Sequence, residues 1–102
     1  MLREELMREA IKLGVRVIMD GAPRIRKELG ITERYKEIKG VIITADEILE
    51  VIAEGNTKPV KEILKKIGFA WTGEKWIYPC GSEEEVLEIA IKTARALGEL
   101  GE

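Results

Sequence analysis

Lysines and aromatic residues gather in one stretch of the chain, between residues 56 and 79. This stretch holds five lysines against two glutamates, a local net charge of +3, and four of the chain's five aromatic residues. Lysine ammonium groups attract phosphates, and aromatic rings can stack on unpaired bases. The combination favours contact with a nucleic acid over the other kinds of chemistry that the sequence offers.

The residues that enzymes use most are scarce. The chain has no histidine, which removes the commonest general base and metal ligand. Cys80 is the only cysteine, so an internal disulfide and a multi-cysteine metal site are excluded. The acidic run at 83–85 is more typical of a helix start than of a metal site, because adjacent helix residues point in different directions. We therefore predict a non-enzymatic protein with no cofactor and no metal, in which Cys80 is a packing residue.

Length and composition predict one folded domain. The chain has 102 residues, of which 45% are hydrophobic and 35% charged. The N-terminus is charged and no apolar run approaches the ~20 residues of a membrane span, so we expect a cytoplasmic protein without membrane contact. A single asparagine, no glutamine and many glutamates and lysines are typical of hyperthermophile, archaeal-like proteins.

The net charge of −2 argues against a strongly basic nucleic-acid binder, so the distribution of charge matters more. Residues 1–40 carry +3, residues 41–80 carry −1 and residues 81–102 carry −4. The acidic residues gather in the middle of the chain and in the tail. They occupy other stretches than the lysines at 56–79.

Apolar periodicity predicts a helical N-terminal part. A helical pattern runs from Leu2 to Met19, although residues 14–19 could instead form a short strand. Asp20 to Pro23 ends that helix and begins another, which stops at Gly30. A third short helix is predicted over 32–39.

The central residues predict a strand followed by a helix. The β-branched run 41–43 favours a strand. The sequence from Thr44 to Glu47 then matches a capping box and predicts a helix that ends at Gly55. The solvent face of this helix would be wholly acidic and would consist of Asp46, Glu47, Glu50 and Glu54.

A second helix, a hairpin and a last helix follow. Thr57 caps a predicted helix over 58–67, and a turn at Gly73 pairs Trp71 with Trp76 and Phe69 with Tyr78. The four rings share one face of this hairpin, which is either a core face or a stacking platform for bases. A capping box at Ser82 begins the last helix, which runs to about Gly98.

This order of elements over residues 41–79 resembles the winged helix-turn-helix superfamily. The resemblance implies that the helix at 57–67 enters the major groove of DNA and that the turn around Gly73 is the wing. The residues that it places nearest DNA are Asn56, Thr57, Lys58, Lys61, Lys65, Lys66 and Lys75. Glu62 on the same helix and the lack of arginine in 41–80 depart from this pattern, so contacts to the DNA backbone are favoured over base reading. The phrase at 68–76 is also similar to small hairpins of several nucleic-acid proteins.

We therefore predict an α+β winged-helix domain with a three-stranded small sheet and additional N- and C-terminal helices. The single domain 1–102 would comprise a helical part at 1–39, a winged helix-turn-helix core at 40–80 and a C-terminal helix at 82–99. The predicted function is binding of double-stranded DNA, as a transcriptional regulator or chromosomal factor. The alternatives are a protein-interaction module that uses the acidic face, and a single-stranded nucleic-acid binder that uses the hairpin.

A homodimer through the terminal helices is also predicted. The apolar arc of each terminal helix covers about half of the helical wheel, which is wider than a minimal core-facing stripe. These arcs would bury against each other and the central motif, or against a second copy, and two-fold dimers are the commonest oligomers.

Overall fold

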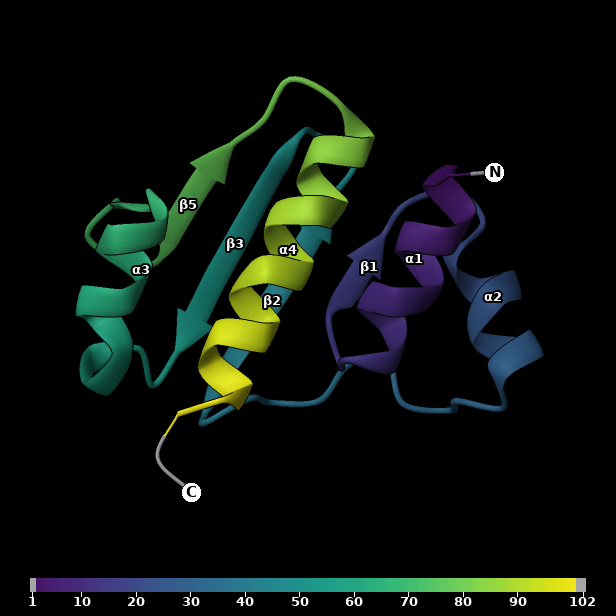
Figure 1. Ribbon diagram of the computed structural model, residues 1–102, viewed down its shortest axis with the longest axis horizontal. Helices are drawn as coiled ribbons and strands as arrows, with labels where there is room; N and C mark the ends of the chain where they lie inside the picture. Colours follow the sequence, from purple (N-terminus) through teal and green to yellow (C-terminus); the bar gives the residue numbers. More distant parts are fainter. Residues whose placement is uncertain (1, 101–102) are drawn as a thin grey trace.

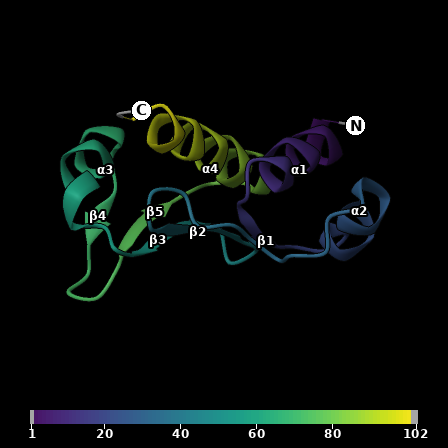
Figure 2. The same cartoon turned by 90° about the horizontal axis from the view of Figure 1, so that it is seen from below.

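A mixed five-stranded sheet with helices on one of its faces forms the protein (Figures 1 and 2). The computed structural model describes residues 2–100. The strands are β1 (Arg16–Ile18), β2 (Val41–Asp46), β3 (Glu50–Gly55), β4 (Ala70–Trp71) and β5 (Trp76–Pro79). The helices are α1 (Leu2–Lys12), α2 (Ala22–Leu29), the 3₁₀ turn η1 (Lys58–Val60), α3 (Lys61–Ile67) and α4 (Glu83–Gly98). The strand order β1-β2-β3-β5-β4 puts β1 and β4 at opposite edges.

The core lies between the sheet and the layer formed by α1 and α4. Figure 2 shows these two helices above the sheet, with α3 beside them at the β4 edge and α2 next to β1. In the β2–β3 ladder Ile43 and its partner Ala53 are fully buried, whereas Ile42 and its partner Glu54, on the opposite face, are partly exposed. The next pair, Thr44 and Ile52, is buried too, so the middle of both strands is covered on both faces. The fold class is α+β, as the sequence predicted.

The N-terminal third differs from the predicted helical pattern. Helix α1 ends at Lys12, and residues 16–18 form β1, which pairs in parallel with β2. The preferred helix through residue 19 is therefore wrong, and the strand alternative is correct. Gly14, at φ +99°, breaks the helix because that backbone conformation is not helical.

The second helix is confirmed and the third is not. Helix α2 begins with a proline in its first turn and ends at Gly30 in the left-handed conformation, as predicted. Residues 32–39 form a loop instead of a helix, and Lys36 donates its backbone N–H to the carbonyl of Gly14. This bond ties the loop to the start of β1.

The predicted helix after Thr44 is a β-strand. Thr44 lies inside β2 and is fully buried, and residues 50–55 form β3, which pairs antiparallel with β2. Gly55 ends a strand and not a helix. The first helix of the predicted helix-turn-helix is thus absent from the described residues, and β2 and β3 belong to a five-stranded sheet instead of a three-stranded one.

The following elements agree with the sequence. Residues 58–67 are helical, with a 3₁₀ turn before α3, and Trp71 pairs with Trp76 in the hairpin of β4 and β5. The hydroxyl of Ser82 accepts the backbone N–H of Glu85 at 3.1 Å, which confirms the predicted helix start at Ser82. The Glu85 carboxylate accepts the backbone N–H of Gly81 at 2.6 Å, one residue before the position that a standard capping box uses.

The terminal helices bury their apolar residues against each other and the sheet. Met7 and Ala10 of α1 and Leu87 of α4 are fully buried, and two ion pairs, Arg3–Glu83 and Arg95–Glu9, each 2.7 Å long, cross from one helix to the other. The wide apolar arcs are thus used inside one chain, and the homodimer stays a prediction. Over residues 2–100, none of the helices combines the length and the apolar character that crossing a bilayer demands.

Candidate nucleic-acid interface

A groove lies between α3 and the β4–β5 hairpin, at one edge of the sheet. Its volume is about 400 Å³. The residues that line it are Thr57, Lys58, Lys61, Lys65, Trp71 and Trp76. Four of the seven residues that the sequence placed nearest DNA are therefore brought together, beside both tryptophans of the chain. We call this the lysine groove.

Trp76 and Thr57 form the fixed floor of the lysine groove. The Trp76 ring is buried, and its Nε1–H donates to the Thr57 hydroxyl oxygen at 3.1 Å. A buried indole N–H needs such an acceptor. Thr57 is the N-cap residue of η1, as predicted, but its hydroxyl makes no capping bond to the helix.

Trp71 is the exposed aromatic residue of the groove. Its side chain remains 52% exposed, with its ring centroid 5.2 Å from that of Trp76 at an interplanar angle of 51°. Phe69, by contrast, is buried and makes an edge-on contact with Tyr78 at 5.6 Å. The aromatic face therefore divides, because Phe69 and Trp76 belong to the core while Trp71 offers a free surface for stacking.

The three lysines of the groove lie along one side of η1 and α3. Their spacing of three and four residues places them on one helical face. Lys65 makes an exposed contact of 3.7 Å with Glu62, whereas Lys58 and Lys61 have no ion pair with any residue in the range 2–100. Two of the three positive charges are thus uncompensated and available to an anion.

Three of the predicted contact residues lie outside the groove. Asn56, Lys66 and Lys75 do not line it, although Asn56 and Lys66 are exposed. Trp71 is the groove residue whose exposure the sequence left undecided. The exposure of the Trp71 ring depends on which part of the hairpin α3 covers. The sequence of the hairpin alone does not determine that packing.

The predicted acidic helix face does not exist as such. Asp46 and Glu50 are opposite each other in the β2–β3 ladder, and Glu47 lies in the turn between these strands. Glu54 forms an ion pair with Arg16 at 3.3 Å. These carboxylates are therefore spread over a hairpin, and one of them is already neutralised.

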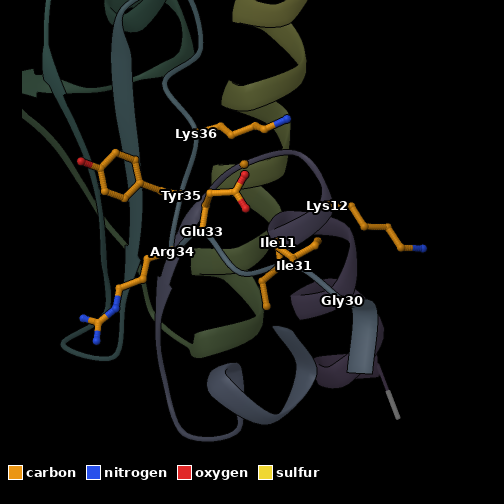
Figure 3. Close-up of a pocket in the computed structure, with 9 residues that line it drawn as sticks. Ile11, Lys12, Gly30, Ile31, Glu33, Arg34, Tyr35 and Lys36 are labelled. Atoms are coloured by element: carbon orange, nitrogen blue, oxygen red, sulfur yellow. The ribbon is translucent and has the colours of Figure 1, made fainter. Parts of the chain in front are cut away.

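A smaller hollow beside α1, of about 270 Å³, lacks the features of a binding site. Figure 3 shows Ile11 and Ile31 at its middle, while Lys12 points outward on one side and Arg34 and Tyr35 point outward on the other. Among the lining residues drawn there, the cationic ends of Lys12, Arg34 and Lys36 do not converge. Within residues 2–100, no three His, Cys, Asp or Glu side chains are grouped so as to hold a metal ion.

Cys80 is unsuited to nucleophilic chemistry. Partial burial, with a smaller effect from the Glu85 carboxylate, raises the pKa of its thiol to about 11. The thiolate is the reactive form of cysteine, so the thiol is almost wholly in its unreactive form at neutral pH.

The reactivity of Cys80 gives a direct test. We expect an aromatic disulfide reagent at about pH 8 to react with the folded protein about tenfold more slowly than with the urea-unfolded chain. The raised pKa lowers the thiolate population about 100-fold, and the higher nucleophilicity of a more basic thiolate recovers about tenfold. The measurement is the absorbance of the released thiolate over time, and equal rates in the two states would contradict the assignment.

Comparisons with protein-family models, with characterised proteins and with solved structures found no match to this chain.

Proposed function

We propose that the protein binds single-stranded nucleic acid in the lysine groove, without catalysing a reaction. The observation that carries the proposal is the exposed ring of Trp71 beside Lys58, Lys61 and Lys65. A ring on which a base stacks, next to cations that follow the phosphates, is the arrangement by which single strands are held.

Single strands fit the groove better than a duplex does. Bases in a duplex are stacked on each other and do not offer a free face to Trp71, whereas unpaired bases do. The seven-residue α3 also has no preceding helix of the kind that positions a recognition helix on DNA, since β3 occupies those residues. Binding of double-stranded DNA by a regulator or chromosomal factor stays a prediction of the sequence, and the same assay tests it.

The test is titration of the protein with oligothymidine, followed by tryptophan fluorescence at several salt concentrations. We expect Lys61→Glu to weaken binding about tenfold or more and to lower the salt slope by roughly one phosphate contact, because it reverses a charge inside the groove. Lys66→Glu is the matched control, with the same charge change on the same helix but outside the groove. It should leave binding nearly unchanged.

Trp71 separates stacking from charge. Trp71→Ala should weaken oligothymidine binding by about 1–3 kcal/mol, and Trp71→Phe should keep most of the affinity. Equal losses for Lys61→Glu and Lys66→Glu would contradict the proposal. So would tighter binding to a duplex that Trp71→Ala does not affect, and this second result would favour the duplex-binding hypothesis.

A further inference from the structure

A second groove lies at the β1 edge of the sheet, at the opposite end from the lysine groove. It has a volume of about 680 Å³ and lies between β1, α2 and the loop that carries Arg34 and Tyr35. Because β1 and β4 are the two edges of the sheet, the two grooves share no residue. Figure 3 shows that Arg34 and Tyr35 project to the same side of their loop, away from the smaller hollow.

The arginines of this groove differ from the others in the chain. Of the seven arginines, five form ion pairs with carboxylates, namely Arg3, Arg8, Arg16, Arg24 and Arg95. Arg26 and Arg34 form none with any described residue, and both line this groove. The arginine charge that the fold leaves uncompensated is thus concentrated at one place.

Arg16 and Tyr35 supply a planar surface beside these free cations. The Arg16 guanidinium carbon lies 5.5 Å from the centroid of the Tyr35 ring. Its Nε donates to the Thr44 hydroxyl at 3.1 Å, and the ion pair with Glu54 holds its other end. Tyr35 is therefore stacked over a fixed guanidinium and remains 37% exposed, which leaves ring surface for a ligand.

Among the described residues, Glu47 is the one carboxylate that lines the groove. Glu54 neutralises Arg16, so the groove keeps two positive charges, on Arg26 and Arg34, against the one negative charge of Glu47. The planar fork of a guanidinium matches a phosphate with two parallel hydrogen bonds. We propose that this groove binds a phosphate-bearing ligand of the nucleotide class, with Arg26 and Arg34 on the phosphate and Tyr35 against the attached ring. The phosphate can come from a free nucleotide or from a nucleic-acid strand.

The experiment is a titration of the full ¹⁵N-labelled chain, followed by NMR, with three probes: inorganic phosphate, adenosine monophosphate and a short oligothymidine. We expect the amide signals of Arg34 and Tyr35 to shift and saturate. Arg26→Gln combined with Arg34→Gln should lower the affinity for the nucleotide at least about tenfold, since hydrogen bonds to charged groups are lost.

A control pair of substitutions distinguishes binding at this groove from attraction by the overall charge of the protein. Lys12→Gln combined with Lys27→Gln also removes two positive charges, but from residues outside the groove. This double variant should keep the nucleotide affinity of the unsubstituted protein. If adenosine monophosphate shifts the amide signals of Arg34 and Tyr35, the ligand of the groove is a free nucleotide. If only oligothymidine shifts them, the ligand is a nucleic-acid strand. No shift of Tyr35 with any probe, or equal losses in both pairs of substitutions, would overturn the proposal. The indole N–H signal of Trp71 reports the lysine groove separately, so failure at one groove is distinguishable from failure at the other.

Discussion

Replacing Leu87 with alanine is expected to lower the free energy of unfolding by about 2–5 kcal/mol. Leu87 is fully buried on α4, which packs on β2, β3 and α1. The truncation removes apolar contacts and leaves a cavity that the surrounding helices and strands fill only in part. Urea unfolding followed by circular dichroism measures the change.

Leu2→Ala is the matched control for Leu87→Ala. The side chain of Leu2 is 59% exposed on α1, so the same truncation there should change the stability by less than about 0.5 kcal/mol. A large and concentration-dependent loss for Leu2→Ala would instead place the start of α1 in an interface between copies, as the homodimer prediction requires. Light scattering on the same samples gives the mass.

Replacing Gly55 with alanine is expected to cost about 2–4 kcal/mol of stability. Gly55 has φ +99°, a backbone conformation that residues with a side chain rarely adopt. An added Cβ would lie 2.8 Å from the carbonyl oxygen of Gly40. That oxygen belongs to the backbone and accepts a hydrogen bond from Asn56, so it cannot move aside freely. Thermal unfolding of the variant measures the loss.

Gly73 isolates the steric part of this effect. Its φ of +102° is nearly the same, but an added Cβ would meet no atom within 4 Å. Gly73→Ala should therefore cost only the backbone strain, about 1–2 kcal/mol. If Gly55→Ala and Gly73→Ala were equally destabilising, the close contact between the added Cβ and the Gly40 oxygen would not contribute to the loss of stability.

The β2–β3 hairpin shows where local sequence patterns fail. Ile48, Leu49, Ile52 and Ala53 recur at helical spacing, and the residues from Thr44 to Glu47 match a helix cap. In β3 the consecutive residues 51–53 are all buried, and pairing with β2 on one side and β5 on the other makes this segment a central strand. The turn has only a weak sequence signal, because it contains no glycine, asparagine or proline and holds Leu49 at φ 66°. The Asp46 carboxylate accepts the backbone N–H of Ile48 at 3.2 Å, and this aspartate is the one turn-forming residue beside it.

Elements with strong local signals were predictable. The N-cap at Ser82, the glycine that ends α2 and the register of the aromatic hairpin all depend on residues close in sequence. The lysine side of the candidate site was also predictable, because lysines at 58, 61 and 65 fall on one helical face. The exposure of Trp71 and the gathering of Arg26 and Arg34 were not, since both follow from packing between distant segments.

The packing of α1 on α4 has a consequence for how the chain folds. The hydrogen bond between Arg95 and Glu9 joins residues 86 positions apart, whereas β2–β3 and β4–β5 are hairpins of neighbouring residues. Contacts between distant residues close large loops and form late in folding. During synthesis on the ribosome, Met7 and Ala10 therefore have no α4 to cover them until residues 83–98 have emerged. The core of this fold is complete only after α4 has left the ribosome.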